Sequence, residues 1–483
     1  MLVLDENCKY SGAKVVDPYD CTLNQTDLKT NKNKFYIMQV IKNGNDHYLF
    51  IRYGRIGEIG RISHIPGSFL ECVNKFVTQF KSKTKNSWDS VAKDHCNFQQ
   101  YSGKYYLCQK QEIKDESIII ADEKKIISKL DKRVQSFMNL IGNLDMLQTT
   151  LKSLDIDTKK MPLGAIKLEQ LEKAEQILAE IEKELSSPPT SEIFLNLSSQ
   201  YYTYVPQVVG RSSKPKLINN TDIIKNYLEK IEDLKNLKIA YTTIESSANI
   251  NSDIHPADDL YSKVRTEIKA VDENSDVWKV IQEYIQNTQG ATHHSHGELV
   301  DIYEIMREDE RERQKELDAV GNVHLLWHGT RLSNYISILK LGLVLRPELV
   351  SNAKITGKMF SNGIYFANSY SKSQNYCGVY SGDEACLFLA EVALGNPSKR
   401  INADYHITHD KLKATGHNSC WGQGKFTPTS QTKLIVDGNR EVIVPNGKLG
   451  HSTLSNPSLL YDEFIVYKEN QLRLRYIVRV KIK

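Results

Sequence analysis

Hydrophobic and polar positions follow three different patterns along the chain, and each pattern predicts a different kind of structure. Residues 35–41 and 47–53 are short runs of aromatic and β-branched side chains, which are typical of strands. Residues 69–85 repeat large apolar side chains every three or four positions, which predicts a helix with Phe69, Val73, Phe76 and Phe80 on one side. Residues 18–112 are therefore expected to be mostly β.

Residues 127–250 carry the helical repeat. One apolar stripe runs through 168–185, on Leu168, Leu171, Ile177, Leu178, Ile181 and Leu185. Pro188 and Pro189 are expected to end this helix, because proline cannot continue the backbone hydrogen bonds. A later helix is expected to follow the capping residues at 219–222, with Ile223, Tyr227, Ile231, Leu234 and Leu237 on one side. Such stripes are typical of the core of a helix bundle.

From about residue 255 the pattern becomes mixed. Residues 387–394 are an apolar run that predicts a strand. Residues 472–482 alternate apolar side chains with Arg and Lys, which predicts an antiparallel strand with one buried and one solvated face. The charged run at 306–318 is expected to be a solvated helix or loop face. The fold class predicted from these patterns is multidomain α+β, with a β-rich part, an all-α part and an antiparallel-sheet α+β part in that order.

Composition excludes several classes of protein. The chain has 483 residues, of which 40% are hydrophobic and 25% charged, as in ordinary globular proteins. No segment approaches the ~18 apolar residues of a membrane-spanning helix. The apolar run at the start of the chain ends at Asp5 and Glu6, so it is too short and too acidic for a signal peptide. Eight cysteines occur without any C-x-x-C pair, so neither a zinc finger nor a disulfide framework is expected, and a reducing cytosolic or nuclear compartment fits best.

The charge is concentrated at one end. Residues 1–110 contain 16 Lys and Arg against 10 Asp and Glu, whereas the rest of the chain contains 47 against 49. A basic domain on a nearly neutral body is one of the features of nucleic-acid binding. A solvated basic surface without a nucleic-acid partner explains the same numbers, so charge leaves the two alternatives open.

Several sequence motifs are absent or do not fit. Gly54, Gly57 and Gly60 are spaced as G-x-x-G-x-x-G with no helix pattern after them, so they do not indicate a dinucleotide-binding Rossmann site. The chain has no phosphate-binding G-x-x-x-x-G-K-[ST], no H-E-x-x-H and no G-x-S-x-G. The histidines at 293, 294 and 296 have no cysteine or carboxylate at a fixed ligand spacing, so no metal site is expected.

Three motifs in the C-terminal half stand out when they are taken together. They are LLWHGT with His328, GIYFA with Tyr365 and YDEFIVY with Glu463. Each residue alone has an ordinary structural explanation, but together they resemble the His-Tyr-Glu triad in the catalytic domain of the poly(ADP-ribose) polymerases. SKSQNYC at 371–377 and EVALGN at 391–396 extend the resemblance.

The resemblance also covers the rest of the chain. KKMPLG at 159–164 and YYTYVPQ at 201–207 resemble the helical regulatory domain of the family, and NKFYIMQV, YGRIGEIG and KTKNSW between 33 and 88 resemble its WGR domain. This order is similar to the DNA-dependent branch without zinc fingers, polymerase 2-like or polymerase 3-like. The expected divisions are an N-terminal extension (1–17), a WGR DNA-binding domain (18–112), a linker (113–120), the helical domain (121–250) and the ADP-ribosyltransferase domain (255–483).

The resemblance implies that NAD⁺ is consumed as a substrate, so no cofactor is expected. Breaking the bond between nicotinamide and ribose develops positive charge on the sugar, as in glycoside hydrolysis. A fixed carboxylate stabilises that charge more than it stabilises the ground state. The family likeness assigns this role to Glu463, which would also polarise an acceptor hydroxyl, and it places Lys372 near the reacting ribose.

The remaining substrate contacts are likewise implied by the resemblance. His328 would hold ribose hydroxyls, while the Gly329 backbone and the Ser373 hydroxyl would bind the nicotinamide amide. Tyr365 and Tyr376 would stack on the two faces of the nicotinamide ring. The ribose and adenine side would be lined by Thr330, Asn334 and Ser337.

Some positions depart from the family pattern. Val344 stands where the family usually has an arginine that faces the adenine and phosphates, and Arg346 is the candidate to replace it. Ser337 replaces a common glycine. Basic residues are partly lost at 416–425, beside the acceptor side, which leaves product length and acceptor choice open. The tryptophan that gives WGR its first letter is Tyr53, which keeps an aromatic face.

For the WGR domain the resemblance implies contact with DNA strand breaks, nicks or ends with a 5′-phosphate, through phosphate and stacking contacts rather than base readout. The candidate contacts are Asn33, Lys34, Tyr53, Gly54, Arg55 and Lys85. The expected acceptors are proteins such as histones and the chain itself, in the nucleus and away from membranes. The family's aromatic C-terminal tail is absent, so a partnership with the accessory factor that directs modification to serine stays open.

The expected function is that of a DNA-break-activated poly(ADP-ribose) polymerase in DNA repair. One alternative keeps the fold but adds a single ADP-ribose per site. A second alternative is a DNA-end scaffold without catalysis, because Val344 and Ser337 depart from the pattern. By the same resemblance the helical domain restrains the site until DNA binds, so deletion of 121–250 is expected to give DNA-independent activity.

Overall fold

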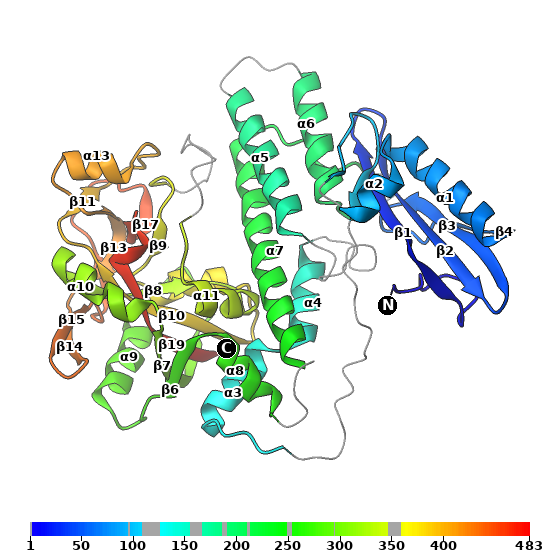
Figure 1. Ribbon diagram of the computed structural model, residues 1–483. Helices are drawn as coiled ribbons and strands as arrows, with labels where there is room; N and C mark the ends of the chain where they lie inside the picture. Colours follow the sequence, from blue (N-terminus) through cyan, green and yellow to red (C-terminus); the bar gives the residue numbers. More distant parts are fainter. Residues whose placement is uncertain are drawn as a thin grey trace. The chain divides into compact units, whose positions relative to one another are not determined.

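The structure is a computed structural model that describes residues 2–94, 97–108, 126–154, 167–185, 191–209, 213–248, 254–293, 295–345 and 359–483 (Figure 1). The linker expected at 113–120, the motif at 159–164 and the prolines at 188–189 lie outside these residues. The chain divides into two compact units, which are described one at a time. The first unit comprises Met1–Lys125 and Leu144–Thr242, and the second comprises Ile126–Asn143 and Thr243–Lys483.

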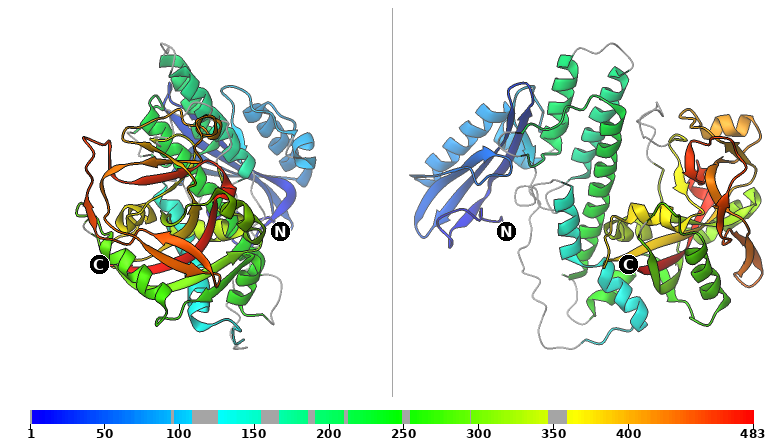
Figure 2. Two further views of the ribbon diagram at one scale, coloured as in Figure 1. Left: turned by 90° about the vertical axis from the view of Figure 1, so that its left-hand side faces the viewer. Right: turned by 180° about the vertical axis from the view of Figure 1, so that it is seen from behind.

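The first unit begins with a five-stranded antiparallel sheet in the order β4-β3-β2-β1-β5. Its strands are β1 (Lys14–Asp27), β2 (Lys32–Asn43), β3 (Asp46–Arg55), β4 (Arg61–Gly67) and β5 (Tyr106–Cys108). Helix α1 (Phe69–Thr84) lies along one face of this sheet, as Figures 1 and 2 show, and α2 (Trp88–Lys93) follows it. The predicted strands at 35–41 and 47–53 and the predicted helix at 69–85 are confirmed.

Helix α1 forms where its sequence supplies both a cap and an apolar face. The Ser68 hydroxyl accepts a hydrogen bond from the Glu71 backbone amide while the Glu71 carboxylate accepts one from the Ser68 amide, a capping box. Phe76 and Phe80 are fully buried against the sheet, but Phe69 at the start of the predicted stripe is 43% exposed. The hydrophobic face therefore begins one turn later than predicted.

The helices of the first unit are α4 (Leu144–Ser153), α5 (Leu168–Glu184), α6 (Ser191–Tyr204) and α7 (Thr221–Ala248), whose last residues from Thr243 belong to the second unit. Figures 1 and 2 show α5, α6 and α7 side by side. Leu171, Leu178 and Ile181 on the predicted stripe of α5 are buried, whereas Leu168 at its first position is 42% exposed.

The sheet and the helices of the first unit are joined through β1 and α6. The Thr26 amide donates to the Thr203 hydroxyl over 3.1 Å, and the Leu28 amide donates to the Ser199 hydroxyl over 2.9 Å. Buried hydrogen bonds of this kind satisfy backbone groups that the sheet itself leaves unpaired. The two parts therefore share one polar seam, which we call the β1–α6 seam.

The second unit is built around a seven-stranded sheet in the order β14-β15-β8-β10-β19-β7-β6 and a four-stranded sheet in the order β11-β12-β18-β9. A three-stranded sheet has the order β16-β13-β17. The strands are β6 (Thr266–Ala270), β7 (Gly297–Arg307), β8 (Val323–Gly329), β9 (Ile364–Phe366), β10 (Glu384–Ala393), β11 (Pro397–Arg400), β12 (Ser419–Gly422), β13 (Gly424–Pro428), β14 (Thr432–Val436), β15 (Arg440–Val444), β16 (Leu449–His451), β17 (Leu459–Tyr461), β18 (Glu463–Val466) and β19 (Leu472–Ile482).

The helices of this unit are short. They are α3 (Lys132–Ile141), α8 (Pro256–Lys263), α9 (Asp276–Asn287), α10 (Glu310–Val320), α11 (Tyr335–Leu341), α12 (Tyr370–Gln374) and α13 (His409–Ala414). The predicted strands at 387–394 and 472–482 correspond to β10 and β19, and the predicted multidomain α+β class is confirmed.

The expected solvated face of β19 is wrong at two arginines. Arg473 and Arg475 are each only 3% exposed, because β19 lies between β10 and β7 in the middle of the sheet. Arg473 pairs with the fully buried Glu391 over 3.0 Å, and Arg475 pairs with Asp437 over 2.6 Å. These ion pairs allow the charges to be buried.

The charged run at 306–318 is also only partly solvated. Arg307 and Glu310 are 4% and 2% exposed, and the Arg307 Nε lies 3.3 Å from the Glu310 carboxylate. Burial raises the pKa of Glu310 to about 7, against the opposing effect of Arg307. The predicted solvated face is interrupted at Arg307 and Glu310, whereas Glu308 and Asp309 between them are exposed. None of the helices in the described part of the chain has the length and apolar character needed to cross a membrane.

Candidate active site

The three motifs of the C-terminal half meet where the two larger sheets of the second unit touch. The backbones of Trp327 in β8 and Ala367 after β9 exchange two hydrogen bonds of 2.9 and 3.0 Å. β9 in turn pairs with β18, with Tyr365 opposite Ile465. Backbone hydrogen bonds thus link the segments that carry His328, Tyr365 and Glu463, although these lie up to 135 residues apart.

Glu463 forms an ion pair with Lys372. The two charged groups are 3.0 Å apart, and their side chains are 14% and 15% exposed. The Lys372 ammonium also donates to the carbonyl oxygens of Tyr461 and Asp462, over 2.9 and 3.2 Å. Burial lowers the pKa of Lys372, and the ion pair with Glu463 opposes that shift. The lysine is therefore held at three points, and it fixes the direction of the carboxylate.

His328 and Tyr365 are linked through the backbone. The His328 Nδ1 lies 3.0 Å from the Tyr365 carbonyl oxygen, which can only accept, so Nδ1 carries the hydrogen in this contact. The Tyr365 hydroxyl donates to the Ser361 carbonyl over 2.8 Å and accepts from the Phe360 amide over 3.1 Å. Burial raises the pKa of Tyr365 well above its ordinary value, so the ring stays an uncharged aromatic surface.

Gly329 is the point of closest approach between β8 and α12. A Cβ at this position would overlap the Ser373 carbonyl group, which is backbone and has no side-chain freedom to move away. The Ser373 hydroxyl donates to the Trp327 carbonyl over 3.3 Å. The geometry therefore brings Gly329 and Ser373 together. The family resemblance assigns these two groups to the same ligand, the nicotinamide amide.

The other expected substrate contacts differ in exposure. Tyr376 is 63% exposed, as suits a ring that receives a ligand from solvent. The Asn334 amide donates to the Thr330 hydroxyl over 2.9 Å, and Asn334 is itself buried. Ser337 is 3% exposed within α11. Of these residues, Asn334 and Ser337 shape the wall of the second unit from inside rather than presenting an open surface.

The position where the family usually has arginine is occupied by an exposed apolar side chain. Val344 is 54% exposed. Arg346, the candidate to replace that arginine, lies outside the described residues. The structure therefore describes the nicotinamide end of the expected NAD⁺ site more fully than the adenine end.

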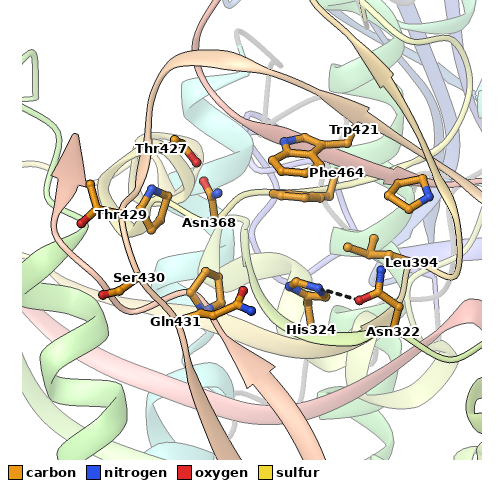
Figure 3. A pocket seen from close by; sticks show the side chains of 13 residues that line it. Asn322, His324, Asn368, Leu394, Trp421, Thr427, Thr429, Ser430, Gln431 and Phe464 are labelled. Atoms are coloured by element: carbon orange, nitrogen blue, oxygen red, sulfur yellow. Dashed lines mark hydrogen bonds between the residues drawn. The ribbon is translucent and has the colours of Figure 1, made fainter. Parts of the chain in front are cut away.

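A separate cavity of about 230 Å³ lies on the other face of β18 (Figure 3). Phe464 stacks between Trp421 and His324 in its wall, with ring centroids 5.3 and 6.4 Å away. Among the residues that the structure describes, the lining of this cavity contains no Lys or Arg. Burial lowers the pKa of His324 to about 4, so this histidine does not supply a cation for a pyrophosphate at neutral pH. Alternation along β18 points Glu463 away from this cavity. We therefore do not place the dinucleotide there.

In the first unit, aromatic and basic side chains gather where α1 ends over β2 and β3. Tyr53 is 38% exposed and stacks on Tyr36, with centroids 5.5 Å apart and the rings within 25° of parallel. Lys83 lies over the Tyr36 ring at 4.6 Å and Lys34 over Tyr105 at 5.0 Å. Lys85, the left-handed C-cap of α1, follows at the same end. We call Tyr36, Tyr53, Lys34, Lys83 and Lys85 the tyrosine–lysine patch.

Three other candidate DNA contacts are engaged with other segments of the first unit. Asn33 is 1% exposed; its amide donates to the Gln207 carbonyl over 3.0 Å and accepts from the Thr26 hydroxyl over 3.0 Å. Arg55 donates to the Ser213 carbonyl over 2.7 Å, and to Asn31. Gly54 packs its Cα against Gly60, where a Cβ would not fit. These three residues are therefore placed in the interior or in contacts between segments of the first unit.

Three protein-family models match the chain. The WGR domain model matches residues 19–95, the poly(ADP-ribose) polymerase regulatory domain model matches 128–261, and the catalytic domain model matches 275–482. The chain is also 33% identical to poly [ADP-ribose] polymerase 2 of Zea mays over 482 residues, covering 96% of this chain and 70% of the maize protein. The chain belongs to the poly(ADP-ribose) polymerase family.

Relatives from animals within the poly(ADP-ribose) polymerase family match along nearly the whole chain as well. Poly [ADP-ribose] polymerase 1 of Gallus gallus is 33% identical over 479 residues, and the Drosophila melanogaster poly [ADP-ribose] polymerase is 31% identical over 476. The chain spans 45% and 46% of these two proteins, about half of their length. The predicted family and the predicted order of WGR, regulatory and catalytic domains are confirmed.

Two members of the tyrosine–lysine patch are not among the contacts expected from the sequence. They are Tyr36, which stacks on Tyr53, and Lys83, which lies over the Tyr36 ring. The alternation of β2 places residues 34 and 36 on one face of the sheet, and α1 ends at residue 84. That period and the end of the helix are the signals that would have identified them.

Proposed function

We propose that this chain transfers ADP-ribose from NAD⁺ to protein acceptors, releases nicotinamide, and is activated by DNA strand breaks. The observation that carries the proposal is the partly buried Glu463–Lys372 ion pair beside the segments of His328 and Tyr365. Membership of the family and the match to its catalytic domain at 275–482 support the same reaction. NAD⁺ is a substrate in this proposal and no resident cofactor takes part.

The proposed chemistry rests on a carboxylate whose direction is fixed before the reaction. As the nicotinamide–ribose bond lengthens, positive charge grows on the ribose, and Glu463 stabilises it without having to reorient. Lys372 supplies that fixed direction because its ammonium is itself held by two backbone carbonyls. Glu463 then serves as the acceptor of the proton from the attacking hydroxyl.

The neighbouring groups orient the dinucleotide in this proposal. His328, which is held through its Nδ1, binds ribose hydroxyls. The Gly329 backbone and Ser373 bind the nicotinamide amide, since glycine alone permits the close approach at this point. Tyr365 and Tyr376 provide aromatic surfaces for the nicotinamide ring, of which Tyr365 is fixed by two hydrogen bonds.

The DNA-binding surface in this proposal is the tyrosine–lysine patch of the first unit. Burial and the neighbouring cations Lys32 and Lys83 lower the pKa of Lys34, so the cations repel one another in the free protein. A bound phosphate relieves that repulsion, and Tyr53 offers a partly exposed ring to an unstacked sugar or base at a break. DNA-break binding supports a nuclear location in repair, with histones and the chain itself as acceptors.

The deciding experiment measures nicotinamide release from NAD⁺ by the full chain, with and without 5′-phosphorylated nicked DNA, with the products sized on a gel. Release that rises with nicked DNA and yields long polymers is the expected result. Single ADP-ribose units instead of polymers would indicate the mono-transferase alternative. No release above that of Glu463→Gln in either condition would overturn the proposed activity in favour of a DNA-end scaffold.

Reversing two charges in the patch is expected to weaken DNA binding. In Lys83→Glu/Lys85→Glu the affinity for nicked DNA should fall about 10- to 100-fold at moderate salt, and the log–log salt dependence should become shallower by about two. Fluorescence anisotropy over a salt series measures both quantities. Lys75→Glu, a single charge reversal at an exposed position of α1 outside the patch, is the control and should keep the slope of the unmodified chain. Equal slopes for the double variant and the control would exclude the patch as the DNA surface.

A further inference from the structure

The second unit contains a turn that contacts two segments of the proposed active site, the one with Lys372 and the one with Glu463. Residues 290–293 form this turn, which is closed by a 3.0 Å hydrogen bond from the His293 amide to the Gly290 carbonyl. It follows α9 directly and precedes β7. His293 belongs to the histidine cluster at 293, 294 and 296, whose spacing does not indicate a metal site.

One side of the His293 imidazole binds the segment that carries Lys372. The His293 Nδ1 lies 2.8 Å from the Ser371 Oγ, and the Gly290 amide donates to the same oxygen over 2.7 Å. Ser371 is 1% exposed and directly precedes Lys372 in α12. Because the backbone amide already uses one lone pair of this oxygen, the turn fixes the Ser371 side chain and with it the start of α12.

The face of the same imidazole packs on the segment that carries Glu463. The His293 and Tyr461 rings lie 5.0 Å apart and within 35° of parallel. The Thr292 hydroxyl lies 2.9 Å from the Tyr461 hydroxyl. The Tyr461 carbonyl is the one that accepts from Lys372 over 2.9 Å, two residues before Glu463.

The space between the turn and Tyr461 is filled. A Cβ on Gly290 would overlap the hydroxyl and ring of Tyr461, so only glycine lets the ring sit at this depth. The turn therefore determines the position of the Tyr461 side chain. The position of that side chain restrains the backbone of residues 461 and 462, which leads into β18.

We propose that His293 is a positioning residue for catalysis: its imidazole connects Ser371 to Tyr461 and thereby sets the relative placement of the Lys372 ammonium and the Glu463 carboxylate. This inference rests on the proposed ADP-ribosyltransferase activity. His293 acts through its neighbours and does not touch the substrate. A change in such positioning should lower the rate of the chemical step. Small displacements of catalytic groups raise the free energy of the transition state more than that of the bound substrate.

The test compares two substitutions that each keep one of the two contacts. His293→Phe keeps a ring on Tyr461 and loses the hydrogen bond to Ser371, whereas His293→Asn presents a side-chain amide near the position of Nδ1 and loses the ring. With saturating nicked DNA, His293→Phe should lower kcat for nicotinamide release about 10-fold with KM for NAD⁺ changed less than about twofold. His293→Asn, which keeps a hydrogen-bonding group for Ser371 but loses the ring contact with Tyr461, should have a kcat between those of the unmodified chain and His293→Phe.

Two further variants complete the experiment. His296→Phe is the matched control, because His296 is exposed and its backbone exchanges two hydrogen bonds with Lys483. It should leave both constants unchanged. Gly290→Ala keeps the His293 side chain but displaces Tyr461 from the turn, so it should lower kcat at constant KM. It tests the placement of Tyr461 by the turn, including the case in which His293→Phe fails to fold.

The outcomes separate this inference from the proposed function. A full chain that releases no nicotinamide with nicked DNA overturns the activity and this inference together. An active chain in which His293→Phe and Gly290→Ala keep the unmodified kcat overturns the inference alone. So does a rise in KM without a fall in kcat, or a His293→Asn variant as slow as His293→Phe. Thermal unfolding midpoints of all variants show whether the fold is retained.

Discussion

Replacing Glu463 with glutamine is expected to lower kcat for nicotinamide release by on the order of 10²–10³-fold, with little change in KM for NAD⁺. The amide keeps the size and the hydrogen-bonding atoms of the side chain but removes the negative charge that would stabilise the ribose cation. It also leaves Lys372, which is only 15% exposed, without its anionic partner. Stopped assays of nicotinamide release at several NAD⁺ concentrations measure both constants.

Glu441→Gln is a suitable control for that variant. Glu441 is an exposed carboxylate of the same unit that pairs with Lys433 on the neighbouring strand β14, and it lies outside the triad motifs. It should be as active as the unmodified chain. If Glu463→Gln kept more than about a tenth of the rate, charge at this position would not drive the reaction, and the carboxylate would have a structural role only.

Deleting residues 144–242 and joining their ends with a short flexible linker is expected to make the activity independent of DNA. Kinship with the family implies that the helical region restrains the resting enzyme. The contact pattern divides that region, since α3 belongs to the second unit, whereas α4 to α6 and most of α7 belong to the first unit with the sheet. Nicotinamide release without DNA should then approach the DNA-stimulated rate of the full chain.

The boundaries of this deletion follow from contacts of α3 with the rest of its unit. Arg133 forms an ion pair with Asp301 in β7 and donates to the Val271 carbonyl over 2.8 Å. The wider deletion of 121–250 would remove these contacts and should lower the thermal unfolding midpoint of the second unit relative to the narrower one. A deletion of 144–242 that still requires nicked DNA would contradict restraint by this region.

Much of the fold could be predicted from local pattern. Apolar positions at helical spacing identified α1 and α5, and alternation identified β19, because the period of a helix or strand is a local property. Local pattern failed at Arg473 and Arg475, which read as solvated. Their partners Glu391 and Asp437 lie 36 to 84 residues away along the chain, and burial of a charge depends on such distant partners.

The sequence motifs show which residues of the proposed active site lie on neighbouring strands, but they do not show which candidate DNA contacts are buried. His328, Tyr365 and Glu463 lie in motifs whose flanking residues form β8, β9 and β18, and these strands are linked by backbone hydrogen bonds. A motif that specifies such a strand therefore also specifies where its functional residue lies. Asn33 and Arg55 are candidates on the basis of a motif alone. In the structure they donate hydrogen bonds to the carbonyl oxygens of Gln207 and Ser213, which lie more than 150 residues away along the chain. No sequence window contains both ends of such a contact.

The His293 contact shows a third case, in which the sequence draws attention to a residue type but does not reveal its contacts. Histidines close together in sequence suggest metal binding, but the spacing of residues 293, 294 and 296 fits no ligand set, and His293 lies in the turn of residues 290–293. Its hydrogen bond to Ser371 spans 78 residues and its ring contact with Tyr461 spans 168. Only the folded arrangement brings one imidazole between two catalytic segments.

The β1–α6 seam has a consequence for how members of this family can be recombined. Its hydrogen bonds join the backbone amides of Thr26 and Leu28 to the hydroxyls of Thr203 and Ser199. Each side of the seam therefore needs the matching groups on the other side. A chimaera that exchanges the N-terminal sheet for that of a distant homologue, while keeping the original helices, would bring mismatched donors and acceptors together. Grafting the sheet and α6 as one cassette would preserve the junction.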